Sequence, residues 1–240
     1  MKLILIANSA GGVGKTTTAL ACAVAATEYG KKVLLIDADA RAALSFACGI
    51  ENPRVTTKEL LNKEFSLDSV VVRTSERFSL VPASTRLVNL GIEELISNTE
   101  FVGQVKDFDL VVVDTSSGFD HYLNFFAAIA DLVLLPTTTD ILSIRGALHA
   151  KDFAVAAGYK KECELLFTKS QPDFDLPKFL AVVDTLGTDF SLLEPAISYS
   201  AEIPNSQSAA KSALSTANQS QVAAEYREIT YSLLEKLELI

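Results

Sequence analysis

A glycine-rich segment near the start of the chain constrains the fold more than any other part of the sequence. It lies between an apolar run, residues 3–7, and a long alanine-rich stretch, residues 17–29, that Gly30 ends. Glycines have no side chain, so the backbone can curl and direct its N–H groups at phosphate oxygens. A following lysine neutralises the β- and γ-phosphates, and a threonine hydroxyl ligates Mg²⁺. The segment therefore predicts a site for ATP and Mg²⁺ with the binding residues Gly11, Gly12, Val13, Gly14, Lys15, Thr16 and Thr17.

Apolar runs of strand length alternate with helical stretches along the rest of the chain. Besides the first run they cover residues 32–36, 110–113, 131–135 and 165–167, each followed by helix or turn signals. This rhythm is typical of an α/β fold in which helices cover both faces of a mostly parallel, twisted sheet. No Pro-, Gly- or Ser-rich linker divides the sequence. We expect residues 1–240 to form a single P-loop NTPase domain.

Composition narrows the compartment and the kinds of partner. Charged residues make up 21% and hydrophobic residues 49% of the 240, as in ordinary globular proteins. No apolar run is long enough to span a bilayer and the first strand begins at Lys2, so we expect a cytoplasmic protein. The net charge of −9 disfavours nucleic-acid binding over the whole surface. Of the three blocks 1–140, 141–170 and 171–240, only 141–170 has a positive net charge. Its five basic and three acidic side chains could gather on one face.

A carboxylate follows the apolar run 110–113 at its C-terminal end. Ligands of open parallel sheets bind at this edge, so Asp114 is the candidate Walker B residue that holds Mg²⁺ while Thr16 ligates the metal directly. Residues 115–118, which end at Gly118, would then act as a switch that responds to the γ-phosphate.

Several motifs together resemble the ParA/MinD family of dimerising ATPases. The loop Ala10–Thr17 resembles that family's deviant Walker A motif, and residues 78–87 contain its Pro-Ala-Ser turn. Asp37 and Asp39 resemble its D-x-D motif, so the resemblance assigns Asp39 to the attacking water and Asp37 to the Mg²⁺ side. It also implies that Thr168 and Pro204 contact adenine.

Two departures separate the sequence from that family pattern. Ala10 stands where the family has its signature lysine, which reaches the partner subunit's nucleotide, and Ala40-Arg41 stands where the family has Pro-Gln. A cation delivered in trans to a transferring phosphoryl group can contribute roughly 10³–10⁵ in rate, so either hydrolysis is slow or another residue substitutes. Lys151 is our preferred substitute over Arg145, because a flexible ammonium best imitates the absent side chain.

The missing lysine makes the sequence most similar to the carboxysome-distributing McdA branch of the family. This resemblance implies an ATP-bound homodimer that binds nonspecific double-stranded DNA on the nucleoid. It also implies an adaptor protein of the McdB or ParB kind that stimulates hydrolysis. Plasmid or chromosome partitioning is the near alternative. The acidic C-terminal helix disfavours a MinD-type membrane anchor, so we expect no membrane partner.

Other classes of function also fit the loop. A metabolic P-loop ligase such as dethiobiotin synthetase has a similar length and also lacks the signature lysine, although its loop begins with Gly-Thr rather than Ser9-Ala10. A nucleotide-gated binding protein that barely hydrolyses ATP is a further alternative. Measurements of carboxylation and of single-turnover hydrolysis separate these classes.

Overall fold

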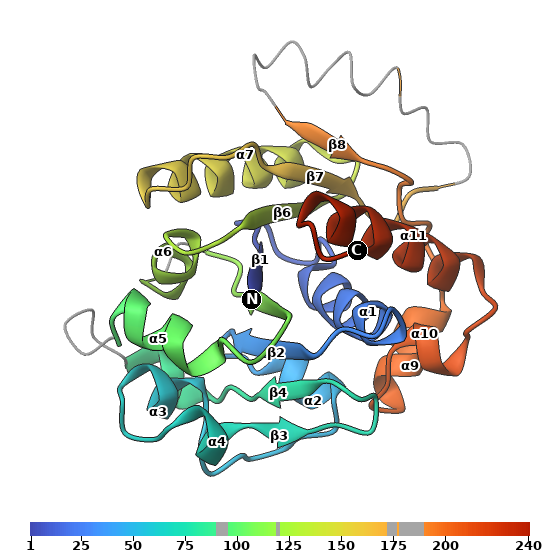
Figure 1. Cartoon of the computed structure of the whole chain (residues 1–240). Coiled ribbons are helices and arrows are strands. Elements are labelled where there is room, and N and C mark those ends of the chain that lie inside the picture. The colour runs from blue at the N-terminus through green and yellow to red at the C-terminus, as the bar shows by residue number, and fades with distance from the viewer. Residues whose placement is uncertain (90–95, 119–120, 172–176, 178–189) are drawn as a thin grey trace.

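A mostly parallel sheet forms the centre of the computed structural model, which describes residues 1–89, 96–118, 121–171, 177 and 190–240. Within these residues the sheet has eight strands in the order β3-β4-β2-β5-β1-β6-β7-β8 (Figure 1). The strands are β1 (Lys2–Ile6), β2 (Val33–Ala38), β3 (Val72–Arg73), β4 (Ser79–Val81), β5 (Leu110–Thr115), β6 (Leu132–Thr137), β7 (Glu164–Phe167) and β8 (Ser191–Leu193). All neighbouring pairs are parallel except β3 and β4. The predicted fold class is confirmed.

Helices cover both faces of this sheet, as Figure 1 shows. One layer contains α1 (Lys15–Glu28), α2 (Ala43–Ala47), α9 (Glu202–Ser208), α10 (Ala213–Thr216) and α11 (Gln221–Lys236). The other contains α3 (Thr57–Leu61), α4 (Leu67–Val70), α5 (Asn98–Val105), α6 (His121–Ala127) and α7 (Ile141–Ala156), with the 3-10 helix η1 (Thr85–Asn89). A hydrophobic core therefore lies between the sheet and each of the two helix layers.

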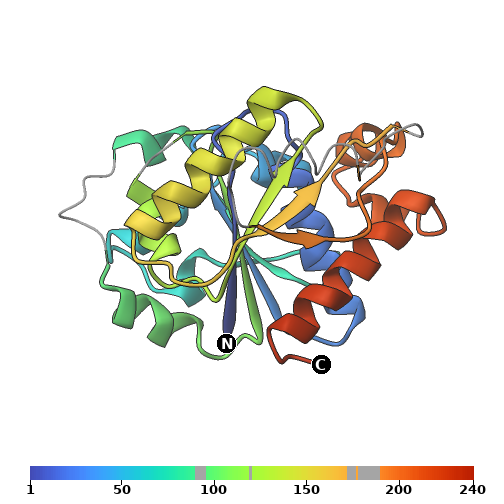
Figure 2. The ribbon, with the colours of Figure 1, turned by 90° about the horizontal axis from the view of Figure 1, so that it is seen from above.

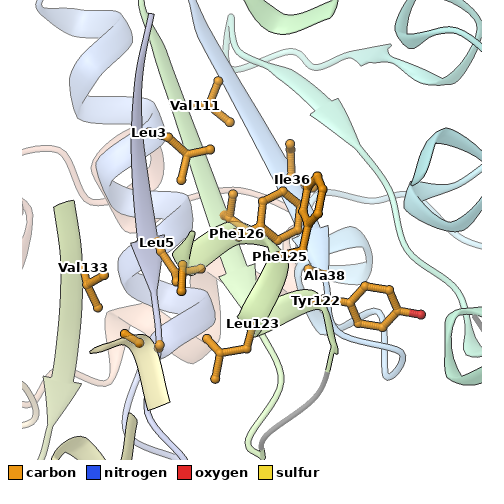
Figure 3. Packing of buried hydrophobic residues seen from close by; sticks show 14 of the residues in the cluster. Leu3, Leu5, Ile36, Ala38, Val111, Tyr122, Leu123, Phe125, Phe126 and Val133 are labelled. Atoms are coloured by element: carbon orange, nitrogen blue, oxygen red, sulfur yellow. The ribbon is translucent and has the colours of Figure 1, made fainter. Parts of the chain in front are cut away.

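Alternation along the strands sends side chains into both cores. In β1, Leu3 and Leu5 enter one core, whereas Ile4 and Ile6 enter the other. Successive side chains of a strand point to opposite faces, so a strand covered on both faces has apolar residues at every position. Figure 3 shows Leu3 and Leu5 with Phe125 and Phe126 of α6 in the first of these cores.

The carboxyl ends of β1, β2 and β5 lie side by side at one edge of the sheet. Ile6 pairs with Asp114, and Asp37 pairs with Asp114 on its other side. In Figure 2 both chain termini lie at the opposite edge, and α7 begins at the carboxyl edge and runs back from it. Ligands of parallel sheets bind at the carboxyl edge, so the fold brings the predicted site residues of three strands together.

The C-terminal stripe predicted from its apolar spacing packs on the core. Val222, Tyr226, Ile229, Leu233 and Leu237 are buried, whereas Ile240 lies beyond α11 and is 47% exposed. Cys22 and Cys163 are buried and Cys48 is half-buried, and all three are free thiols. In the described part of the chain, no helix has the length and apolar character needed to cross a membrane.

Candidate nucleotide-binding site

The glycine-rich loop joins β1 to α1 at the carboxyl edge, where the sequence places it. Gly12 and Gly14 have φ angles of 75° and 87°, in the left-handed region that glycine adopts without steric cost. Gly14 is the N-cap of α1, so the positive end of this helix dipole points at the loop. A Cβ on Gly14 would lie 3.5 Å from the Thr168 hydroxyl. The backbone therefore has the form of a phosphate cradle.

Lys15 folds back over the loop instead of extending into solvent. Its Nζ donates to the carbonyl oxygens of Asn8 and Ala10, each at 2.9 Å, and the residue is only 6% exposed. Burial lowers the pKa of this ammonium to about 8, although the nearby charge of Asp114 opposes the shift. A phosphate oxygen is a charged acceptor and binds an ammonium more strongly than a carbonyl does. Lys15 is thus placed to exchange its carbonyl contacts for phosphate.

Asp114 and Thr16 are in direct contact beside the phosphate loop. The Thr16 hydroxyl donates to Asp114 Oδ2 at 2.7 Å. The other oxygen, Oδ1, is buried and accepts no hydrogen bond from the described residues. Burial and the charge of Asp37 raise the pKa of Asp114 well above its usual value. A cation would give Oδ1 a partner and would stabilise the charged form of Asp114, so these residues fit Mg²⁺.

The metal site has few protein ligands. No group of three or more His, Cys, Asp or Glu residues within the described ranges could hold a metal ion. Magnesium commonly takes one or two protein ligands and completes its shell with waters and substrate phosphates. The Thr16–Asp114 pair is consistent with that kind of site, in which the nucleotide supplies part of the coordination.

Asp37 lies beside Asp114 but has a different environment from the one that its predicted metal role requires. Its Oδ1 accepts from the Asp39 N–H at 3.0 Å, and its Oδ2 accepts from the N–H and hydroxyl of Ser45 at 2.9 and 2.7 Å. Burial raises its pKa to about 6, against these hydrogen bonds. Oδ2 thus holds Ser45 of α2 and Oδ1 holds the turn that follows β2, so both oxygens of Asp37 have protein partners, whereas Asp114 has an oxygen without one among the described residues.

Asp39, the predicted hydrolytic carboxylate, is held by Arg41. The Arg41 Nε lies 3.1 and 3.0 Å from the two carboxylate oxygens of Asp39, and one terminal nitrogen lies 2.6 Å from Oδ2. The Arg41 N–H also donates to Asp39 Oδ1 at 2.9 Å. This pairing was not anticipated from the sequence. Its signal was the arginine where the family pattern has glutamine.

Helix α7 braces the loop from the other side through Asn8 and Gly146. The Asn8 side chain donates to the carbonyls of Pro136 and Ser143 and accepts from the Ala10 N–H. A Cβ on Gly146 would lie 2.3 Å from Asn8 Oδ1 and 2.8 Å from the Ala10 nitrogen. Only glycine allows α7 to approach this closely. An isolated glycine inside a helical pattern was the signal that could have revealed the contact.

A pocket of about 590 Å³ opens over the loop, within the size range of small-molecule sites. Its walls come from the loop, from the end of β2 with α2, and from α9, and include Gly12, Gly14, Lys15, Thr16, Thr17, Asp39, Arg41, Phe46, Lys169, Pro204 and Gln207. A second pocket of about 230 Å³ adjoins it and is lined by Thr168, Tyr199, Pro204 and Tyr226 among others.

The two residues predicted to contact adenine have different surroundings. Pro204 lines both pockets, in keeping with a base-contacting position. Thr168 lines the smaller pocket, but its hydroxyl donates to the Val13 carbonyl at 2.8 Å and so supports the loop. Gln207, which the sequence did not single out, donates to the Thr17 hydroxyl at 3.1 Å. The adenine assignments stay predictions.

The predicted switch lies against the loop. Thr115 donates to the Ile6 carbonyl at 2.8 Å, and a Cβ on Gly11 would lie 3.8 Å from the Ser117 hydroxyl. Gly118 has φ 152°, which the conformational freedom of glycine permits. The segment is therefore close enough to the loop to contact bound phosphate, and its role as a switch stays a prediction.

Lys151 does not lie with these residues. It is eleventh in α7, and its ammonium lies 4.8 Å from the centre of the Phe190 ring, next to the first residue of β8. Because α7 runs from the carboxyl edge to the amino edge, this position is about 15 Å along the helix from its start. Arg145 is exposed beside Gly146, nearer the loop. A role for either residue across a dimer stays a prediction.

The positive block 141–170 does not gather all its lysines on one face, which was one of the arrangements that the sequence allowed. Lys169 donates to the Gly12 carbonyl at 2.6 Å, at the carboxyl edge. Lys161 donates to the Asp131 carbonyl at 2.8 Å, just before β6 begins at the amino edge. The strands separate these two lysines, so the block does not form a single basic patch.

The fold and the loop together define a P-loop nucleotide-binding protein of the α/β class. The AAA domain family matches residues 1–155, which is more than half of the 240. The chain belongs to this family.

Individual relatives extend this assignment. The chain is 34% identical over 158 residues to an uncharacterized ATP-binding protein of Methanocaldococcus jannaschii, a match that covers 65% of this chain and 60% of that protein. It is 27% identical over 161 residues to maintenance of carboxysome distribution protein A of Synechococcus elongatus, covering 63% and 64%. These matches span less than two thirds of the relatives' lengths. The chain thus has homologues in the ParA/MinD family, and membership of the McdA branch stays a prediction.

Solved structures share the fold over the whole chain. The structure of cobyrinic acid a,c-diamide synthase from Mycobacterium smegmatis with bound ADP and magnesium aligns with a TM-score of 0.82 at 22% identity. The alignment covers 99% of this chain and 96% of that one. At this identity the likeness establishes the fold alone.

Proposed function

We propose that this protein is an ATP-dependent, dimerising ATPase of the ParA type that positions intracellular cargo. In the ATP state it forms a homodimer and binds nonspecific DNA of the nucleoid in the cytoplasm. An adaptor of the McdB or ParB kind then stimulates hydrolysis to ADP and phosphate, and carboxysomes are the proposed cargo. The relationship to a carboxysome distribution protein supports this cargo.

The observation that carries the proposal is the buried Thr16–Asp114 pair next to Lys15. Asp114 Oδ1 accepts no hydrogen bond from the described residues, while Thr16 binds the other oxygen. Such a pair suits a triphosphate whose Mg²⁺ bridges the β- and γ-phosphates. Bound Mg²⁺ would neutralise charge that develops on the transferring phosphoryl group. Asp39 is the proposed group that orients the attacking water, once it is released from Arg41.

Dimerisation tests the proposal most simply. We expect the chain to sediment as a dimer with Mg²⁺ and ATP, and as a monomer with ADP or without nucleotide. The variant Lys151→Ala separates binding from pairing: if Lys151 replaces the signature lysine, the variant binds ATP but stays monomeric. A wild-type chain that has the same oligomeric state in all three conditions contradicts the proposal.

DNA binding has its own test, because no single basic patch is formed by residues 141–170. Binding to a random duplex should require ATP, and the logarithm of its association constant should fall linearly with the logarithm of the salt concentration, as counterion release demands. Equal affinity with ATP and ADP would contradict a nucleotide-controlled DNA partner. Stimulation of ATP hydrolysis by the adaptor and DNA together would support it.

An ATP-dependent ligase of the dethiobiotin synthetase kind is the second candidate function, and a further pocket beside the nucleotide pocket supports it. This pocket of about 440 Å³, lined by Arg41, Phe46, Asn52 and Ser84 among others, adjoins the nucleotide pocket through Arg41 and Phe46. A ligase would form ADP only when a small carboxylic acid or amine acceptor is present. Release of ADP that depends on such an acceptor, and not on DNA, would favour this function over the first.

A further inference from the structure

Three cationic side chains line the larger pocket in the described part of the chain: Lys15, Arg41 and Lys169. Two of them bind carbonyls of the phosphate loop, Lys15 at Asn8 and Ala10 and Lys169 at Gly12. Arg41 differs, because its partner is a carboxylate at the end of β2. The three cations therefore reach the pocket from two sides, and Arg41 reaches it from the side of Asp39.

The Arg41–Asp39 pair joins an exposed side chain to a buried one. The side chain of Arg41 is 62% exposed, whereas that of Asp39 is 4% exposed. Ala42, the next residue, has a left-handed φ of 53°, and its N–H donates to the Asp39 carbonyl at 2.8 Å. The backbone turn therefore fixes Asp39 independently of the guanidinium. Arg41 can change partner without a change in the fold.

The position of this pair relative to the metal site decides which phosphate it can reach. Asp37 pairs with Asp114 and Ala38 with Thr115, so Asp39 continues β2 alongside the end of β5. Thr16 and Asp114 would hold the Mg²⁺ that neutralises the charge of the terminal phosphates. A terminal phosphate held beside that pair would lie at the same end of the pocket as Asp39 and Arg41. Lys169 also lines the smaller pocket, which Asp39 and Arg41 do not line.

Charge favours an exchange of partners at this end. The charges of Arg41 and Asp39 act on the pKa of Lys15 in opposite directions, so all three groups belong to one electrostatic cluster. A triphosphate adds a strongly negative terminal group beside Asp39. Guanidinium binds phosphate bidentately, with the same geometry with which it binds carboxylate. The terminal phosphate thus competes with Asp39 for Arg41. A diphosphate lacks this phosphate.

We propose that Arg41 distinguishes triphosphate from diphosphate by exchanging Asp39 for the terminal phosphate when ATP binds. The exchange frees Asp39 only when the γ-phosphate is present. It also provides a cation of this chain's own for the terminal phosphate. The inference rests on the proposed nucleotide-binding function and specifies which residue reads the nucleotide state.

Titrations with two nucleotides test this assignment. The affinities for Mg²⁺ with β,γ-imido-ATP and for Mg²⁺ with ADP are measured by calorimetry for the wild type, Arg41→Ala and Arg41→Gln. Arg73→Ala is the matched control, since Arg73 is an exposed arginine on β3 that lines neither pocket. We expect both Arg41 variants to bind the triphosphate analogue about tenfold or more weakly, with ADP affinity changed less than about twofold. Arg73→Ala should leave both affinities unchanged.

The two nucleotides also distinguish the ways in which the assignment could fail. An equal loss for both, or no loss for either, in variants with the wild-type thermal midpoint would overturn the role of Arg41 and leave nucleotide binding intact. A wild type that binds neither nucleotide would overturn the proposed function itself. Because Arg41 is largely exposed, we expect both variants to fold.

Discussion

The phosphate loop and the rim formed by residues 39–42 border the same pocket but are held in different ways. Buried contacts to α7 and to Thr168 fix the loop, and the closest approach occurs at Gly146. The rim has a fixed backbone turn, but its pocket-facing cation is an exposed guanidinium on a buried carboxylate. Both regions carry charge, yet only the rim can rearrange without loss of core packing.

This difference separates two kinds of recognition within one site. The loop is preorganised, so a change in the loop should affect every nucleotide that has a β-phosphate. The rim can change its partner, so a change there should affect only the response to the terminal phosphate. Each prediction below tests whether this division is correct.

Replacement of Lys15 should have the largest effect. Lys15→Ala removes the buried cation of the loop. Because the hydrogen bonds of a charged group to phosphate contribute strongly to the binding free energy, the affinity for both ATP and ADP should fall on the order of 10²-fold. Calorimetry with each nucleotide measures this loss. Lys106→Ala, which removes an exposed lysine outside the pocket, is the control. A loss confined to ATP would break the division between loop and rim.

The pH dependence of stability should reveal the buried carboxylate between the two regions. The pKa of Asp37 is raised to about 6 in the folded chain, so its contribution to stability is fully present below about pH 4 and is lost as the pH rises through 6. Between pH 4 and 7 the wild type should lose roughly 3 kcal/mol of unfolding free energy relative to Asp37→Asn.

Urea denaturation of both proteins at several pH values gives this difference. Asp114→Asn should also reduce the fall in the wild type, because burial and the charge of Asp37 raise the pKa of Asp114 itself in the folded chain. Parallel curves for the wild type and Asp37→Asn would show that Asp37 is not buried as a costly charge.

The glycine brace should have a smaller effect. Gly146→Ala places a methyl group within contact distance of Asn8 and the Ala10 backbone, and overpacking of this kind costs about 1–3 kcal/mol. Gly103→Ala, in the open part of α5, should instead be neutral or stabilising by about 0.5–1 kcal/mol. Thermal unfolding compares the two. A Gly146→Ala variant as stable as Gly103→Ala would show that α7 does not brace the loop.

Local motifs made the fold and the chemical centre predictable from the sequence. The loop, Thr16 and Asp114 follow strand and helix signals that act over a few residues, and the pairing of Thr16 with Asp114 follows from parallel strands that end at one edge. Contacts over long separations were not predictable in the same way. Asn8 and Gly146 are far apart in the sequence, and nothing near either residue specifies the other.

The rim shows a second reason why prediction was incomplete. The sequence indicated acidic residues at the end of β2, but it did not specify which protein groups would donate hydrogen bonds to their carboxylate oxygens. The backbone N–H and the hydroxyl of Ser45 donate to Asp37, and the guanidinium of Arg41 donates to Asp39. These choices depend on the turn at Ala42. The sequence also did not specify the direction of α7, which places Lys151 beside Phe190, and the predicted role of Lys151 across a dimer stays untested.

The central claim is that Asp114, with one oxygen on Thr16 and the other open, forms the magnesium side of a nucleotide site. Its most direct test is the affinity for ATP, measured by calorimetry with and without Mg²⁺, in the wild type and in Asp114→Asn. We predict that Mg²⁺ tightens ATP binding by about tenfold or more in the wild type and by less than about twofold in the variant. The same dependence on Mg²⁺ in both proteins would contradict the claim.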